Sequence, residues 1–254
     1  MTNASDIDAA SRSGHPKIRV EIPVRGATLD ADWFPAQEPV GVVLFSHGSG
    51  SSHLSPRNRF VASYLANQGF HCLLSDLLTP EEDRIRANRF DIDLLTTRLL
   101  ECADWAFRRR ETDGLPACYF GASTGAASAL LAVTRRPNDS RIRTVVCRGG
   151  RPDLAMEHLD GFPVPVLLLV GELDFEVLRL NRLALRRLPP PSTLHVVPGA
   201  SHLFEEPGAL EQVARTTDHW LHQRFGASLS QTESGSVVES NPSVTESNAG
   251  GAGP

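Results

Sequence analysis

The sequence is short of cysteine and aromatic residues, and it has no long apolar run. Four of its 254 residues are cysteines and 6% are aromatic. The cysteines (Cys72, Cys102, Cys118 and Cys147) form no C-x-x-C pair and no other metal-ligand spacing. We therefore expect no metal site and no disulfide scaffold, but small buried hydrophobes in a reducing compartment. No apolar stretch reaches the roughly 18 residues of a membrane-spanning helix, so no membrane partner is expected.

An excess of positive charge is also absent. The formal net charge is −5 and the pI is about 6.0, which disfavours nucleic acid as a partner because phosphate binding needs a basic face. The N-terminus lacks the apolar segment of a signal peptide, so we expect a cytoplasmic protein. We also expect it to be a monomer or a homodimer.

The two ends of the chain differ in composition from the middle. Residues 226–254 are mostly Ser, Thr, Glu, Asn and Gly, which predicts a disordered tail, and residues 1–16 are expected to be loose. The remaining residues, 17–225, are predicted to form one domain, and a hydrophobic content of 41% supports a sizeable core.

Within this domain, apolar runs alternate with helical patterns. Two alternating runs around Arg25-Gly26 predict an antiparallel hairpin. Further strands are expected at 40–47, 70–77, 116–120, 142–147, 165–170 and 193–197, and helices at 58–68, 91–110, 124–136, 153–159, 176–188 and 209–225, with a loop at 78–90. The order predicts an α/β protein with a mostly parallel sheet of about eight strands, helices on both faces and no large cap domain.

A Gly-Ala-Ser-Thr-Gly segment, residues 121–125, follows the strand expected at 116–120 and precedes an Ala-rich helix. A G-x-S-x-G at such a junction is typical of the nucleophile elbow, a tight turn that exposes a reactive serine above the sheet. This pattern makes Ser123 a candidate nucleophile. The alternative is an ordinary Gly-Ser turn in which Ser123 caps the helix.

An acid and a base follow in the order that this fold requires, Ser then Asp or Glu then His. Asp174 and His202 each come just after a predicted strand, at the edge where parallel sheets place their chemistry. His202 would take the serine proton, and Asp174 would hold the imidazole in one tautomer. Glu172 and Asp153 are rival acids. Taken alone, each residue is explained as well by a capped turn or a solvated loop.

The segment Ser46-His47-Gly48-Ser49-Gly50 follows another predicted strand. An H-G-x-G at this place supplies an oxyanion donor in many hydrolases, so we expect the backbone N–H groups of Ser49 and Thr124 to be the two donors. His47, Gly48 and Gly50 are expected to contact substrate. An ordinary Gly-Ser loop is the alternative.

Two arginines, Arg148 and Arg151, follow a strand end on the same edge. They could bind an anionic group of a substrate, or pair with Asp153, Glu172 or Glu176 in a structural network. We favour the structural network. Asp76 and residues 78–82 are expected to form one wall of the site.

Five segments together resemble the dienelactone hydrolase-like branch of the α/β-hydrolase superfamily, and within it bacterial hydrolases of which some are fused to phosphoribosyltransferase domains. They are SHGSGSSHLSPRNR, DLLTPEE, FGASTGAASALLA, RGGRPDLA and GASHLFEEPGALEQVA. The resemblance implies hydrolysis of an ester or related acyl bond through an acyl-enzyme, without a cofactor. It maps the nucleophile to Ser123, the acid to Asp174 and the base to His202.

One departure from that branch matters. Dienelactone hydrolases proper use a cysteine nucleophile, so dienelactone itself is not expected as the substrate, and at this length we expect no fused phosphoribosyltransferase domain. We expect a carboxylesterase that acts on a small-molecule acyl substrate. The alternatives are a thioesterase or acyltransferase with the same triad, or a non-catalytic binding protein that keeps the fold.

Overall fold

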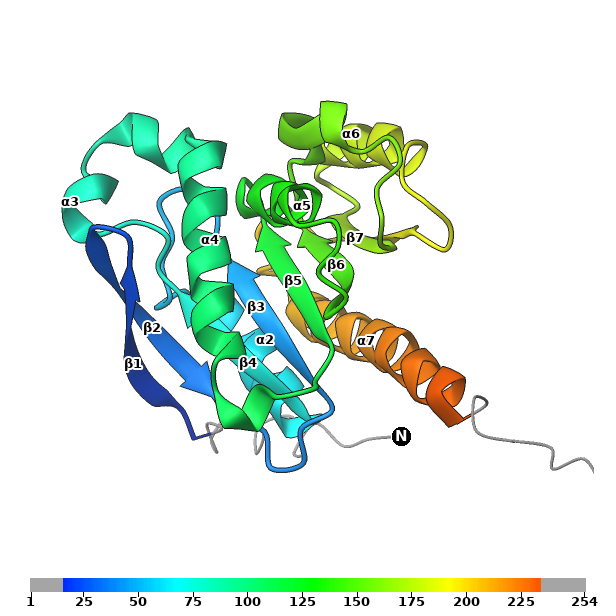
Figure 1. The fold of residues 1–254 in the computed structure, drawn as a ribbon. Coiled ribbons are helices and arrows are strands. Elements are labelled where there is room, and N and C mark those ends of the chain that lie inside the picture. Colours follow the sequence, from blue (N-terminus) through cyan, green and yellow to red (C-terminus); the bar gives the residue numbers. More distant parts are fainter. Residues whose placement is uncertain (1–15, 234–254) are drawn as a thin grey trace, which may run out of the picture.

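The computed structural model describes residues 16–233, which form one eight-stranded sheet between two layers of helices (Figure 1). The strand order is β1-β2-β4-β3-β5-β6-β7-β8. The strands are β1 (Ile18–Val24), β2 (Ala27–Phe34), β3 (Gly41–Ser46), β4 (Phe70–Ser75), β5 (Ala117–Ala122), β6 (Ile142–Arg148), β7 (Val166–Gly171) and β8 (Thr193–Val197). The β1–β2 and β2–β4 pairs are antiparallel and the others are parallel. The predicted α/β class, hairpin and strand number are confirmed.

The helices cover the sheet on both faces, as predicted. They are α2 (Pro56–Asn67), α3 (Pro80–Asp83), α4 (Ile92–Phe107), α5 (Gly125–Arg135), α6 (Phe175–Leu185) and α7 (Ala209–Glu233), with 3-10 turns η1 (Arg86–Phe90), η2 (Arg110–Thr112) and η3 (Pro152–His158). Helices α4, α5 and α6 contribute to the core on one face, and α2 and α7 to the core on the other (Figure 1).

The continuous apolar runs in the strand sequences are explained by the helices on both faces of the sheet. In β6, Val145 and Cys147 pack in the core under α5, whereas Val146 packs in the core under α7. Because successive side chains of a strand point to opposite faces, a strand between two helical layers needs apolar residues at every position. Every residue of β3, β4, β5 and β7 is buried.

The structure differs from the expected elements in three places. The helix expected at 153–159 is the kinked 3-10 turn η3. The expected loop at 78–90 contains α3 and η1, because Thr79 and Glu82 form a capping box that starts a short helix. Helix α7 continues past its expected end at Phe225, since Gly226 does not take the positive φ with which a glycine ends a helix. The expected tail is therefore wrong for residues 226–233. Residues 1–15 and 234–254 lie outside the described residues.

All four cysteines are free and buried. Burial raises the pKa of Cys102 and of Cys147 to about 12, which keeps these thiols protonated and unreactive. In the part of the chain that the structure describes, no helix is both long and apolar enough to cross a membrane.

Candidate active site

Ser123 lies at the tight turn between β5 and α5, and its backbone is strained. Its φ is 51°, a left-handed value that only one other non-glycine residue takes within residues 16–233. The Ser123 N–H donates to the carbonyl of Arg148 (3.1 Å), and its own carbonyl accepts from the Arg151 N–H (3.0 Å). The end of β6 therefore holds the strained turn in place.

The two glycines of the G-x-S-x-G segment are sterically required. A Cβ on Gly121 would collide with the backbone of Ala126, and a Cβ on Gly125 with the carbonyl of Ser46. Thr124, not Ser123, occupies the N-cap of α5, and it makes no side-chain capping bond. The alternative in which Ser123 caps this helix thus finds no support, and the turn has the steric form of a nucleophile elbow.

Asp174 and His202 meet at the ends of β7 and β8. Nδ1 of His202 donates to Oδ2 of Asp174 over 2.6 Å. Asp174 occupies the N-cap of α6 but makes no side-chain capping bond, so its carboxylate is free for the imidazole. The side chain of Asp174 is 14% exposed and that of His202 39% exposed. With Nδ1 bound to the carboxylate, Nε2 is the nitrogen left to exchange a proton.

The Arg148-Gly149 turn connects this pair to Ser123. The Arg148 carbonyl binds the Ser123 N–H, and a Cβ on Gly149 would lie 3.4 Å from Nδ1 of His202. Gly149, with φ of 53°, leaves room for the imidazole ring. Among the described residues the Ser123 hydroxyl has no hydrogen-bond partner; such bonds often tighten only when substrate binds.

The two rival acids have other partners. Glu172 accepts a hydrogen bond from the Gly199 N–H (2.8 Å). Asp153 forms a two-bond pair with Arg151 (2.8 and 2.7 Å). Neither carboxylate is bonded to His202, so the geometry favours Asp174 as the partner of the imidazole. The pair with Asp153 also gives Arg151 the structural role that we favoured.

The loop after β3 approaches the elbow closely. A Cβ on Gly48 would lie 3.0 Å from Cβ of Ser123. The Ser49 N–H, expected as an oxyanion donor, donates to Oγ1 of Thr124 (2.8 Å). Thr124 follows the nucleophile in sequence, so its hydroxyl lies where a substrate oxygen would accept this N–H. The Ser49 N–H is therefore occupied by the Thr124 hydroxyl in this structure.

His47 shapes this loop through its two ring nitrogens. Nδ1 donates to the Gly48 carbonyl (2.9 Å), and Nε2 accepts from the Leu77 N–H (3.1 Å). Burial lowers the pKa of His47, which favours the neutral ring that this bonding needs. Because both nitrogens bind backbone groups, His47 has no polar atom left for the substrate contact we expected.

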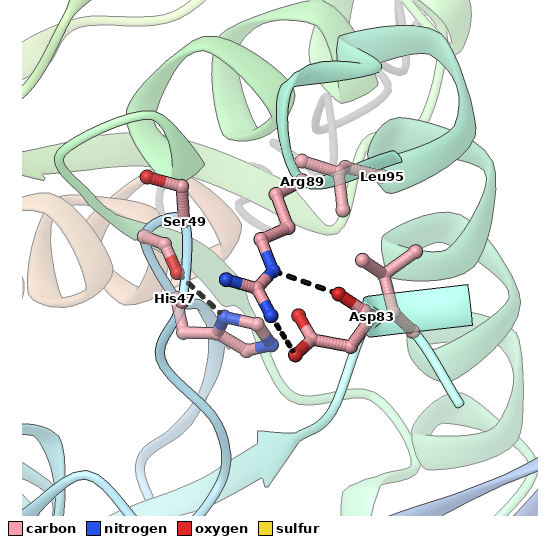
Figure 2. A pocket seen from close by; sticks show the side chains of 8 residues that line it. His47, Ser49, Asp83, Arg89 and Leu95 are labelled. Atoms are coloured by element: carbon pink, nitrogen blue, oxygen red, sulfur yellow. Dashed lines mark hydrogen bonds and ion pairs between the residues drawn. The ribbon is translucent and has the colours of Figure 1, made fainter. Parts of the chain in front are cut away.

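A small hollow lies between this loop and the segment after β4 (Figure 2). It is lined by His47, Gly48, Ser49, Gly50, Leu78, Asp83, Arg89 and Leu95. The guanidinium of Arg89 lies across from the loop and binds the carbonyl (2.8 Å) and the carboxylate (2.7 Å) of Asp83 (Figure 2). Of the expected wall, Asp76 and residues 78–82, only Leu78 lines this hollow, and the sequence reasoning missed its neighbours Asp83, Arg89 and Leu95. The Thr79–Glu82 capping box was the available signal.

A second His–Asp pair lies in the same loop region. His53, 3% exposed, has Nδ1 2.8 Å from Oδ1 of Asp76, which also accepts the His53 N–H (2.7 Å). Nε2 of His53 is bound by the guanidinium of Arg19. Since arginine only donates, Nε2 is an acceptor and carries no proton. Within residues 16–233, no group of three or more His, Cys, Asp or Glu side chains could hold a metal ion.

Known proteins resemble this chain in sequence and in fold. A family model described as alpha/beta hydrolase fold matches residues 41–204. A crystal structure of dienelactone hydrolase from Anabaena variabilis has a TM-score of 0.78 and 44% identity, covering 82% of this chain and 98% of that one. Est1E from Butyrivibrio proteoclasticus has a TM-score of 0.70 at 15% identity, covers 82% of this chain and 99% of its own, and shows the fold alone.

Two curated relatives come from strains of Mycobacterium tuberculosis and are provisionally named phosphoribosyl transferases. Each is 53% identical over 223 residues, which is 87% of this chain and 49% of the relative. The chain therefore spans about half the length of the curated relatives it matches.

Proposed function

Because the chain belongs to the α/β-hydrolase family, in its dienelactone hydrolase-like branch, we propose that it is a serine hydrolase that cleaves a small acyl ester. One observation carries the proposal. Ser123 stands in left-handed backbone at a strand-to-helix turn, and the hydrogen-bonded pair of His202 and Asp174 adjoins the same turn. This is the set of groups that acyl transfer through a serine requires.

The proposed reaction uses the groups as follows. Nε2 of His202 takes the Ser123 proton while Oγ attacks the ester carbonyl, and Asp174 stabilises the imidazolium. The N–H groups of Thr124 and Ser49 bind the oxyanion, the latter after release from the Thr124 hydroxyl. The imidazolium gives its proton to the leaving alcohol. Water then attacks the acyl-enzyme, with His202 again as the base, and restores Ser123.

Exposed apolar side chains support an acyl substrate. Leu173 and Phe175 flank Asp174 and are 52% and 73% exposed, and Leu203, next to His202, is 41% exposed. Leu54 and Leu154 are also exposed on segments that follow strand ends of the same edge. Large apolar groups beside convergent polar groups are typical of small-molecule sites, and here they would contact the acyl chain.

Thioesters are the second substrate class, because the same triad would open either bond. We do not transfer the name of the M. tuberculosis relatives to this chain, since it covers only half of their length. As part of the proposal, the protein acts in the cytoplasm on a small molecule and needs no cofactor.

A fluorophosphonate probe tests the mechanism directly, because it reacts with an activated serine. We expect labelling of the wild type and none of Ser123→Ala. Ser140→Ala, an exposed serine beyond the far end of α5, is the control and should label like the wild type. Absent labelling of the wild type, or labelling that persists in Ser123→Ala, would sink the mechanism. Matched nitrophenyl-ester and acyl-thioester substrates then decide between the two substrate classes.

A further inference from the structure

Arg148 is a buried cation without a counter-ion. It is 8% exposed, its Nη1 is buried without a hydrogen-bond partner, and its side chain forms no ion pair with any described residue. The other buried arginine among residues 16–233, Arg98 on α4, is paired with Glu82 and Glu101. Proteins rarely bury a charge without a partner because desolvation is costly, so the state of Arg148 calls for an explanation.

Arg148 stands beside the proposed nucleophile. It is the last residue of β6, its carbonyl accepts the Ser123 N–H, and the next residue, Gly149, lies against His202. Alternation along β6 places its side chain on the face of Val146, which packs in the core formed by α2 and α7. The side chain of Arg148 therefore leaves the catalytic edge on the face of the sheet that α2 and α7 cover.

The surroundings of Arg148 are positive. Burial and the charge of Arg57, at the start of α2, lower the pKa of Arg148 to about 10, so it remains charged at neutral pH. The nearby carboxylate of Glu205 is already bound to Arg57 (3.0 Å). Two cations therefore lie close to each other here, and only Arg57 has a counter-ion among the described residues.

The other two arginines of this edge have counter-ions of their own. Arg151 is paired with Asp153, and Arg89 with Asp83. The carboxylates of the edge are therefore committed to other partners, and the pairing with Asp153, Glu172 or Glu176 that we considered from the sequence does not form for Arg148.

We propose that Arg148 is an anion subsite of the catalytic edge, and that it binds a carboxylate or phosphate group carried by the ester substrate. This rests on the proposed function, whose substrate class it narrows to acidic acyl esters. The planar guanidinium binds either group through two parallel hydrogen bonds, which would satisfy the orphaned Nη1 and offset the repulsion from Arg57.

A thermal-melting experiment with inorganic phosphate as the probe tests the subsite without any turnover. In buffer free of polyvalent anions, Arg148→Met should melt at or above the wild-type temperature, because it removes an uncompensated buried charge. Saturating phosphate should raise the melting temperature of the wild type by about 2–10 °C and leave that of Arg148→Met unchanged. A lower melting temperature of Arg148→Met in both buffers, with equal phosphate shifts, would assign Arg148 a structural role and overturn the subsite.

Two esters of equal length test whether the anion belongs to the substrate. Nitrophenyl hemiglutarate carries a carboxylate where nitrophenyl valerate carries a methyl group. Arg148→Met should lower kcat/KM for the hemiglutarate by about tenfold to a hundredfold and leave that for the valerate within about threefold. Arg148→Lys should recover part of the loss. Arg143→Met, an exposed arginine on the same strand, is the matched control and should change neither.

The outcomes separate the two proposals. Equal losses on both esters, or none on either, would overturn the subsite even if phosphate protects the wild type, because the anion would then not be part of the substrate. If no ester is hydrolysed and the fluorophosphonate probe does not label Ser123, the proposed function fails instead.

Discussion

In the described part of the chain, two His–Asp pairs lie at one edge of the sheet. They differ in whether the second ring nitrogen of the histidine has a partner. In both, Nδ1 donates to a carboxylate, over 2.6 Å from His202 to Asp174 and over 2.8 Å from His53 to Asp76. The second nitrogen of His53 accepts from Arg19, and the ring is 3% exposed. The ring of His202 is 39% exposed, and its Nε2 has no partner among the described residues.

The difference teaches that a carboxylate beside an imidazole is not enough to make a catalytic base. A base needs its second nitrogen within reach of the proton that it removes. Only the pair of His202 and Asp174 leaves that nitrogen without a partner among the described residues, and its ring adjoins the turn that holds Ser123. The pair of His53 and Asp76 connects the loop after β3 to the end of β4 and to β1, so we assign it to the architecture of the site.

The sharpest way to break this comparison is to remove each carboxylate's charge. Asp174→Asn should lower kcat about 10⁴-fold, because an amide stabilises the wrong tautomer of His202 and cannot stabilise the imidazolium. Asp76→Asn should lower kcat by less than about tenfold, since Nε2 of the His53 ring is bound by Arg19 and cannot accept the serine proton. Steady-state kinetics on a nitrophenyl ester measures both.

Asp153→Asn is the control for the choice of acid. Its carboxylate binds Arg151 and makes no bond to His202, so kcat should stay within about threefold of the wild type. A large loss in Asp153→Asn together with a small one in Asp174→Asn would show that the acid is misassigned.

The sequence predicted one of these pairs and not the other, for a physical reason. Asp174 and His202 follow successive strands that are neighbours in a parallel sheet, so strand order alone brings them together. His53 and Asp76 meet because β3 lies between β4 and β5 and the loop after β3 folds back over the end of β4. Such contacts depend on loop conformation, which no periodicity records.

The arginines also divide into contacts that the sequence predicts and contacts that depend on the three-dimensional structure. Arg151 and Asp153 are two residues apart, so their pairing is local and could be anticipated from the sequence. That Arg148 lacks a partner depends on what surrounds it in three dimensions. The occupied Ser49 N–H could not be predicted for the same reason, because it requires the Thr124 hydroxyl, from a distant segment, to lie at the loop.

A second way to sharpen the comparison separates stability from turnover. His53→Ala removes a buried ring and its bonds to Asp76 and Arg19, so the free energy of unfolding should fall by about 1–3 kcal/mol. The same variant should keep kcat within about fivefold, provided that it is assayed well below its melting temperature.

His202→Ala should show the opposite behaviour. Its half-exposed ring contributes little burial, so we expect a change in unfolding free energy below about 1 kcal/mol, with turnover reduced to background. Urea unfolding and steady-state kinetics measure the unfolding free energy and kcat of His53→Ala and His202→Ala. If His53→Ala abolished turnover at unchanged stability, the architectural role of this pair would be wrong.

The smallest expected effect concerns His47, a buried histidine whose ring binds backbone groups rather than a carboxylate. Burial lowers its pKa below the ordinary value of 6.5, and burial does the same to His71. Below about pH 6.5 the unfolded chain takes up protons that the folded chain excludes, so the free energy of unfolding must fall as the pH drops from 7.5 toward 5. Each pH unit of separation between the folded and unfolded pKa is worth about 1.4 kcal/mol per histidine.

His47→Gln should remove its part of this pH dependence, because an amide oxygen can still accept from the Leu77 N–H but takes up no proton. Urea unfolding at pH 7.5 and pH 5 measures the change, and Arg143→Gln, an exposed control on β6, should keep the wild-type slope. An unchanged slope in His47→Gln would mean that the ring can take up its proton in the folded state, against its two backbone bonds. Burial and these two bonds would then not be what distinguishes His47 from His202, whose Nε2 has no partner among the described residues.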